Sequence, residues 1–327
     1  MFLTFLFLLP LINSFRIKYY RKVPFIAEIY NLNINNIDMQ EEAELQYLFK
    51  STPVLIFKNQ TLTPQEHYDF CCLFDKRHTD NIVHPFKDTQ VPECPQLALR
   101  GKGWIHDTFG VKNKDIVNGQ TFKYNPVWHQ DLVGVKNKLP TIVSSMYVLE
   151  IPEKGGATLF ASLEKGYENL SSNLKYSKYM NLQCCYSTIK ALDAQIDHTG
   201  YGRIDKYWAK DLKDFANVIQ DLVVQPLVIY PDSKSMKKTL MISPNNFYNF
   251  LGFTPDKSQE IMREILNSCV FVENNTERVN YEKNDLLIFN NRKVIHSTTP
   301  KEEIEGTIIY SLLFLDTQEK FTYSIFN

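Results

Sequence analysis

The chain has 327 residues, with 36 Lys and Arg against 37 Asp and Glu, so its formal net charge is −1. At about 150 residues per domain this length allows two domains or one large β domain, and 44% hydrophobic residues with 22% charged residues indicate a globular chain. The absence of a Lys/Arg block argues against nucleic-acid binding, and the six cysteines form neither a C-x-x-C pair nor a spaced disulfide framework.

The N-terminal segment, residues 1–15, reads MFLTFLFLLPLINSF. Its apolar run from Phe2 to Ile12 is shorter than the roughly 17–25 residues needed to cross a bilayer, so no transmembrane span is predicted. The run resembles the apolar region of a secretory signal, although the usual positive flank is missing. We therefore expect residues 1–15 to be a targeting segment for the secretory pathway or an organelle. The alternative is a buried N-terminal segment of a cytoplasmic protein.

In the first half of the remaining chain, the sequence predicts a helix, a buried strand and a second helix. Helix-like spacing covers Met39–Lys50, and the apolar run Pro53–Phe57 predicts a buried strand. A capping box that begins at Thr63 predicts a helix over Pro64–Phe74. The stretch Arg77–Asn125 has no clear periodicity and is expected to form loops around short strands that could line a site.

The second half is richer in strand signals. A polar segment at about 164–223, with a helix-like stretch around 210–219, interrupts them and is interpreted as a lid inserted into a domain spanning 16–327. Predicted helices begin near Ser162 and cover Pro255–Asn267. Predicted strands are Thr141–Leu149, Thr158–Ala161, Gln225–Tyr230, Thr239–Ile242, Val270–Glu273, Asp285–Phe289 and Thr307–Leu315. Many strands with few helices predict a mainly β fold, a sandwich or barrel with flanking helices.

A possible metal site combines His129 and Asp131 with a distant histidine. Residues two apart in an extended segment point to the same face, so both side chains could reach one ion. A third ligand would complete a two-His-one-carboxylate facial triad, which holds Fe(II) and leaves positions open for an oxidant and a co-substrate. His296 is the natural candidate for that third ligand.

Four separated motifs resemble the taurine dioxygenase (TauD/TfdA-like) family of Fe(II)/2-oxoglutarate-dependent oxygenases. They are VLIFKNQ followed by LTPQ from residue 54, WHQD from residue 128, GGATLFAS from residue 155, and NDLLIFNNR from residue 284, four residues before His296. The resemblance implies a double-stranded β-helix (jelly roll) and an enzyme that uses Fe(II), 2-oxoglutarate and dioxygen to hydroxylate or oxidise a small molecule.

The resemblance also implies roles for single residues. It makes His129, Asp131 and His296 the iron ligands. Thr158 matches a hydroxyl donor to the 2-oxoglutarate carboxylate, and Asn125 matches a substrate-pocket position. Three neighbours are expected to be structural: Arg292 should tie a strand end, Trp128 should pack beside the metal, and Gln130 should point away from it.

One departure from the family concerns the co-substrate. An Arg that grips the distal carboxylate of 2-oxoglutarate is expected fifteen residues after the distal histidine, but Ser311 stands there, and Thr307 replaces a second Arg. Loss of a charge-assisted pair should weaken 2-oxoglutarate binding roughly 10- to 150-fold. We expect Thr307 and Ser311 to face the co-substrate, with Tyr310 and Leu312 on the other side of the strand.

Three interpretations of that departure remain open at this point. A cation from elsewhere could replace the Arg, the first candidates being Lys237, Lys238 and Lys293. The co-substrate could be a different 2-oxo acid. Alternatively, the chain could be a non-catalytic descendant of the family that keeps the fold and the metal.

Overall fold

The computed structural model describes residues 15–20, 23–116, 128–187, 192–196, 204–209, 222–299 and 304–322. Its largest element is an eight-stranded sheet in the order β1-β2-β3-β17-β7-β19-β5-β6, antiparallel except where β2 pairs with β3. The strands are β1 (Arg16–Tyr19), β2 (Ile26–Tyr30), β3 (Val54–Phe57), β5 (Leu97–Thr108), β6 (Val111–Ile116), β7 (Val143–Glu150), β17 (Leu286–Asn290) and β19 (Ile308–Phe314).

A second sheet packs against one face of the first. It has the order β16-β8-β18, with β16 at Thr276–Val279, β8 at Thr158–Ser162 and β18 at Val294–Thr298. One buried cluster joins the two sheets, because Phe160 of β8 packs with Met146 of β7 and Leu287 of β17. We call the face of the large sheet that contributes to this cluster its inner face. Two packed antiparallel sheets form the predicted jelly roll.

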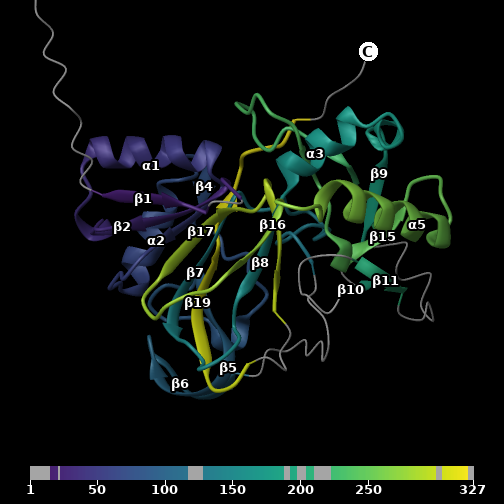
Figure 1. Cartoon of the computed structure of the whole chain (residues 1–327). Coiled ribbons are helices and arrows are strands. Elements are labelled where there is room, and N and C mark those ends of the chain that lie inside the picture. Colours follow the sequence, from purple (N-terminus) through teal and green to yellow (C-terminus); the bar gives the residue numbers. More distant parts are fainter. Residues whose placement is uncertain are drawn as a thin grey trace, which may run out of the picture.

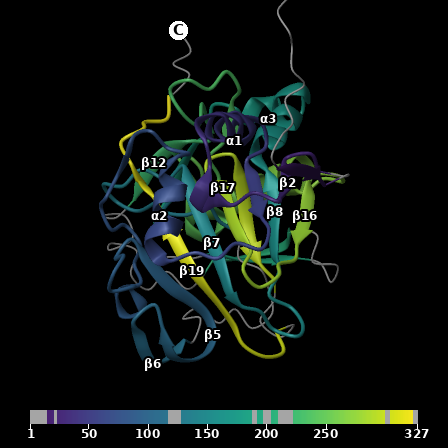
Figure 2. The same ribbon diagram turned by 90° about the vertical axis from the view of Figure 1, so that its left-hand side faces the viewer.

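Helices cover the opposite, outer face of the large sheet (Figures 1 and 2). They are α1 (Met39–Ser51) and α2 (Pro64–Cys72), and each begins with a capping box, as predicted for α2. Leu45 and Phe49 of α1 pack with Phe57 of β3 and Leu99 of β5 in a second buried cluster. Burial of this apolar side of the helices fixes which side chains of every sheet strand point outward and which point inward.

A third buried cluster lies beyond the small sheet, where Figure 1 shows α3 and α5. It includes side chains of α3 (Leu163–Ser172) and α5 (Pro255–Ile265). Smaller strands around it are β9 (Gln183–Tyr186), β10 (Leu192–Ile196), β11 (Ile204–Ala209), β12 (Val223–Pro226), β13 (Val228–Ile229), β14 (Thr239–Leu240) and β15 (Phe247–Phe250). A separate pair is formed by β4 (His78–Thr79) and β20 (Asp316–Thr317). The start of the predicted lid is thus α3 and β9, whereas its helix-like stretch at 210–219 lies outside the described residues.

Two predictions about these elements were wrong. The predicted strand Val270–Glu273 is the end of a π-helical turn, Leu266–Val270, that continues α5, and the turn that follows it. The stretch Arg77–Asn125, predicted to be loops around short strands, contains the 12-residue β5. Gly101 and Gly103 of β5 have φ angles of 139° and 138°, a conformation that interrupts the alternation by which strands are recognised.

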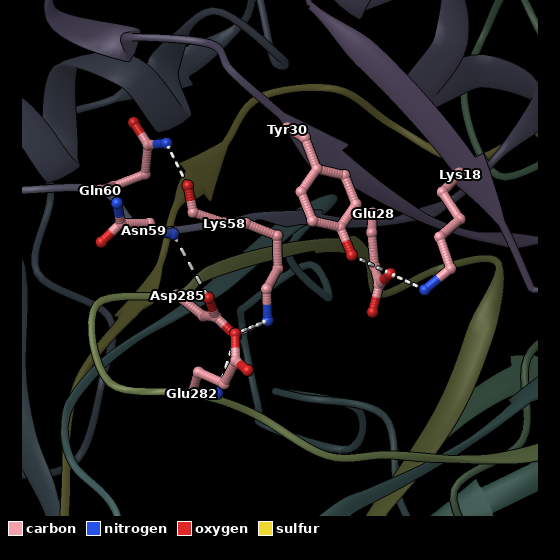
Figure 3. Close-up of polar contacts among 8 residues, drawn as sticks. All are labelled: Lys18, Glu28, Tyr30, Lys58, Asn59, Gln60, Glu282 and Asp285. Atoms are coloured by element: carbon pink, nitrogen blue, oxygen red, sulfur yellow. Dashed lines mark hydrogen bonds and ion pairs between the residues drawn. The ribbon is translucent and has the colours of Figure 1, made fainter.

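Ion pairs join neighbouring strands in the part of the large sheet formed by β1, β2, β3 and β17 (Figure 3). Lys58 Nζ lies 2.6 Å from the buried Asp285 Oδ2 and 2.8 Å from Glu282 Oε2. Lys18 Nζ similarly lies 2.7 Å from Glu28 Oε2 across β1 and β2. The contacts of Lys58 fix the start of β17, the strand that leads to the distal histidine.

The N-terminal prediction is only partly covered by the structure. Phe15, the last residue of the predicted targeting segment, is buried in the outer-face cluster, so the fold begins at or before this residue. Residues 1–14 lie outside the described part of the chain. Within that part, no helix has the length and apolar character that crossing a membrane requires.

Candidate metal centre

The three predicted metal ligands meet between the two sheets. His129 pairs with His296 of β18 through two backbone hydrogen bonds of 2.9 and 3.0 Å. Asp131 Oδ1 lies 3.6 Å from His129 Nε2 and 3.7 Å from His296 Nε2. One ligand atom from each residue lies within 4.8 Å of the other two, so the predicted convergence is present.

Amide side chains hold the loop that carries the first two ligands. The Gln130 side chain donates to the Asn291 carbonyl at 2.7 Å and accepts from the Ile242 amide at 2.8 Å, pointing away from the ligands as predicted. The Asn291 side chain accepts from the Asp131 amide at 2.6 Å and donates to its carbonyl at 2.9 Å. The backbone of Asp131 is therefore fixed on both sides.

The two oxygens of Asp131 have different partners. Ser144 of β7 donates to Oδ2 at 2.7 Å, which leaves Oδ1 directed toward the two histidines. Burial alone would raise the pKa of Asp131, but the neighbouring histidines and Ser144 outweigh it and lower that pKa. The carboxylate is thus ionised at neutral pH and presents one oxygen to an ion.

The histidines differ in exposure. Burial lowers the pKa of His296 to about 3, so its imidazole is neutral and can act as a ligand. The rings of Phe160 and Phe289 lie 5.9 and 4.8 Å from its ring. The His129 side chain is 30% exposed, against 11% for His296 and 6% for Asp131, so the cluster is open on the His129 side.

This donor set fits Fe(II). Two neutral imidazoles and one carboxylate oxygen are the ligands of the facial triad, which leaves the remaining positions for co-substrate and oxidant. Adjacent ligand atoms at bonds of about 2.1 Å around one ion lie about 3 Å apart. The observed distances of 3.6 and 3.7 Å are slightly longer than this spacing, so small side-chain movements would bring the three atoms to one ion.

Thr158, the predicted co-substrate hydroxyl, lies on the metal side of β8. It is two residues before Phe160, which pairs with His296, so the two side chains share a face. Tyr281, which was not among the predicted site residues, lies beside Thr158. Tyr281 is buried in the cluster between the sheets, where burial raises its pKa well above the usual value, and Thr158 and Tyr310 are its neighbours. No sequence motif marks Tyr281, because it follows β16 rather than any family-like segment.

The prediction for Thr307 and Ser311 was wrong. Along β19, Ile309 and Leu313 belong to the outer-face cluster, and Ser311 between them stands opposite Leu99 and Tyr147 of the same cluster. Thr307 precedes the strand and packs over Gly103 of β5, where an added Cβ would lie 2.5 Å from the threonine methyl. Their hydroxyls therefore do not face the triad.

The inner face of β19 carries other residues. Ile308, Tyr310 and Leu312 pack in the cluster between the two sheets, together with Phe160 beside His296. Side chains alternate along a strand, so Tyr310 on the inner face requires Ser311 on the outer face, and Ser311 cannot also face the metal. The turn before β19 sets this register, and the spacing from His296 does not.

Two other predictions of structural roles are confirmed. Arg292 is fully buried and donates to the carbonyls of Pro140, Pro231 and Glu319 at 2.8–2.9 Å, so it ties three segments together. Trp128 is buried with its ring 4.5 Å from that of Phe271.

Two of the candidate cations, Lys293 and Lys238, have partners elsewhere. Lys293, a candidate cation, bonds to the Lys50 carbonyl at 2.7 Å and pairs with Glu164 at 3.0 Å. Lys238 places its ammonium over the Tyr230 ring. Asn125, the predicted substrate contact, lies outside the described residues.

A His-Asp-His facial triad between the two sheets of a jelly roll defines the class of non-haem iron oxygenases. The chain belongs to the family described as "Taurine catabolism dioxygenase TauD, TfdA family", whose model matches residues 19–307. The protein is therefore an enzyme of the Fe(II)- and 2-oxoglutarate-dependent dioxygenases. This membership favours an enzyme over a non-catalytic descendant.

Curated relatives agree with this family. An alpha-ketoglutarate-dependent xanthine dioxygenase, xan1 of Schizosaccharomyces pombe, is 23% identical over 351 residues, covering 88% of this chain and 83% of that protein. An alkylsulfatase of Acinetobacter baylyi is 28% identical over 171 residues, covering 52% of this chain and 50% of that protein.

Solved structures show the same fold. A putative alpha-ketoglutarate-dependent taurine dioxygenase from Burkholderia xenovorans superposes with a TM-score of 0.66 at 17% identity, covering 94% of this chain and 91% of that one. The protein AAD-2, crystallised with Mn(II) and N-oxalylglycine, has a TM-score of 0.63 at 14% identity and covers 94% of this chain and 99% of its own.

Proposed function

We propose that this protein oxidises a small molecule with dioxygen and 2-oxoglutarate at an Fe(II) ion bound by His129, Asp131 and His296. The observation that carries this proposal is the convergence of the three ligand atoms within 4.8 Å, with one side of the cluster partly exposed. Bound Fe(II), with its two co-substrates, supplies the oxidising chemistry.

The surrounding residues prepare the site for that chemistry. Ser144 holds one carboxylate oxygen of Asp131, so the other is free for the ion, and the buried His296 stays neutral. Phe160 and Phe289 keep water from the His296 side. Thr158 is placed to donate a hydrogen bond to a carboxylate of the co-substrate from the same face.

The substrate is proposed to be a small molecule rather than a nucleic acid. Two of the related proteins are named for xanthine and for alkyl sulfates, which are small molecules. The chain itself has a net charge of −1 and no basic block that would neutralise a phosphate backbone. These observations leave the individual substrate to experiment.

An anaerobic titration tests the proposal. Purified protein is mixed with Fe(II) and then with 2-oxoglutarate, and the weak visible charge-transfer band of the chelate is recorded. We expect a band in the wild type, no band in His296→Ala, and an unchanged band in His106→Ala, because His106 is exposed on β5 and is not one of the three clustered ligands. A wild type that binds Fe(II) without developing a band would contradict the proposal, as would a band that persists in His296→Ala.

A further inference from the structure

The co-substrate of the proposed reaction carries a second carboxylate, and the position where a family member would hold it lacks an arginine. A buried carboxylate needs a cation or several hydrogen-bond donors to offset its desolvation. Because Ser311 faces the outer-face helices, any such cation must come from another residue on the inner face.

Arg100 of β5 lies on that inner face. It stands directly opposite Tyr310 in the antiparallel pairing of β5 with β19, so the two side chains are neighbours on one face. Tyr310 packs between the sheets, and the charge of Arg100 acts on it, opposing the burial that raises the pKa of Tyr310 to about 12. The neighbours of Arg100 in β5 do not compete for the inner face. Leu99 packs on the outer face, and residue 101 is a glycine.

The Arg100 guanidinium has no carboxylate partner among the residues that the structure describes. Within the described ranges, no acidic oxygen lies at salt-bridge distance from it, and the nearby Asp88 pairs with Lys114 at 3.7 Å. The guanidinium stacks on the Phe86 ring, whose centroid lies 4.0 Å from the central guanidinium carbon. Stacking uses the face of the guanidinium and leaves its N–H edge available, which is the edge that binds a carboxylate in bidentate fashion.

Hydroxyl groups lie between Arg100 and the strand that carries His296. Tyr281 lies beside Tyr310 and Thr158, and Thr158 is on the strand that pairs with the His296 strand. The buried Tyr281 hydroxyl makes no well-aligned hydrogen bond with any residue that the structure describes. Burial of a donor without an acceptor is destabilising, so this hydroxyl, like the guanidinium, is suited to an anionic ligand.

We propose that Arg100, on β5 instead of β19, grips the distal carboxylate of 2-oxoglutarate, with Thr158, Tyr281 and Tyr310 donating hydrogen bonds around it. This inference rests on the proposed function, because the ligand is the co-substrate of that reaction. It makes Arg100 the residue that selects a dicarboxylic 2-oxo acid.

Lys102 is the cation that could act in place of Arg100. It lies two residues further along β5 and opposite Ile308, but its ammonium already donates to the Ile304 carbonyl at 3.1 Å. An ammonium also lacks the planar fork that holds both carboxylate oxygens. Lys102→Met is therefore a matched control, since it removes a cation from the same strand.

The test compares two ligands on protein loaded with Mn(II), which occupies the site without turnover. The ligands are 2-oxoglutarate and 2-oxopentanoate, which has a methyl group in place of the distal carboxylate. Dissociation constants are measured by calorimetry for wild type, Arg100→Met, Arg100→Lys and Lys102→Met. The Mn(II) affinity of each variant is measured first and shows that its fold and triad are intact.

We expect Arg100→Met to bind 2-oxoglutarate roughly ten- to a hundredfold more weakly. Its affinity for 2-oxopentanoate should stay close to that of the wild type, because that ligand lacks the group that Arg100 contacts. Arg100→Lys should lie between the two, and Lys102→Met should match the wild type.

Three results would overturn the inference. Arg100→Met could keep its affinity for 2-oxoglutarate, it could lose affinity for both ligands equally, or Lys102→Met could show the loss instead. If the wild type binds neither Mn(II) nor 2-oxoglutarate, the proposed function fails and this inference fails with it. A wild type that binds both, together with an unaffected Arg100→Met, refutes only the role of Arg100.

Discussion

The hydrogen bond from Ser144 to Asp131 should determine how tightly the triad binds its ion. Both residues are buried, and the Ser144 hydroxyl lies 2.7 Å from Oδ2, so the bond is charge-assisted and shielded from water. Hydrogen bonds to charged groups contribute about 1.5–3 kcal/mol, and each 1.4 kcal/mol corresponds to a factor of ten. Removal of partners that orient metal ligands generally weakens metal binding about 10- to 100-fold. We therefore expect Ser144→Ala to bind Mn(II) or anaerobic Fe(II) ten- to a hundredfold more weakly.

The adjacent residue provides the control for this experiment. Ser145 points to the outer face, where its hydroxyl lies 2.7 Å from His67 Nε2 of α2. Ser145→Ala should leave metal affinity unchanged while lowering the free energy of unfolding by about 1 kcal/mol, the usual contribution of one neutral hydrogen bond. Metal titrations and urea unfolding of both variants separate the two effects. The reasoning is refuted if Ser144→Ala binds metal like the wild type, or if Ser145→Ala loses affinity by the same factor.

Three other predictions concern stability and processing. Arg292→Met should lower the free energy of unfolding by about 3 kcal/mol or more, because three carbonyl oxygens lose their donors; urea unfolding checks this, and an unchanged midpoint would contradict it. Burial lowers the pKa of His67 to about 3, whereas a histidine in the unfolded chain has a pKa near 6.5. The contribution of His67 to the free energy of unfolding is therefore fully present above pH 6.5. It declines by about 1.4 kcal/mol per pH unit as the pH falls toward 3. His67→Gln should show a shallower decline in urea unfolding at pH 7, 6 and 5, and an identical slope would rule out this assignment. We also propose that residues 1–14 are removed in the cell as a targeting segment, which intact-mass analysis of natively expressed protein tests; a chain that begins at Met1 would disprove it.

The metal ligands could be predicted from the sequence because their placement depends on local rules. His129 and Asp131 are two residues apart in an extended segment, which places their side chains together in any sheet. The distal His296 follows a motif of apolar strand residues and Arg292 that fixes where its strand begins. The helix α2 was equally predictable, since Thr63 and Glu66 form its capping box within the helix itself.

The site features that the sequence did not predict depend on backbone conformation and on contacts between distant segments. Glycine conformations at residues 101 and 103 concealed the long strand β5, and with it the position of Arg100. Tyr281 reaches the site from the end of β16, far in sequence from Thr158, which it approaches only through sheet packing.

The orientation of β19 shows most clearly where the sequence alone is insufficient. Its residues and their composition predicted a strand at Thr307–Leu315, and the structure has one at Ile308–Phe314. Which face Ser311 or Tyr310 occupies depends on the turn before the strand, because a shift of one residue moves every side chain to the opposite face. Packing against the helices on one side and the small sheet on the other decides that register. The sequence thus determined the ligands, the fold class and the strand, whereas only tertiary packing determined that Arg100, and not Ser311, lies on the side of the metal.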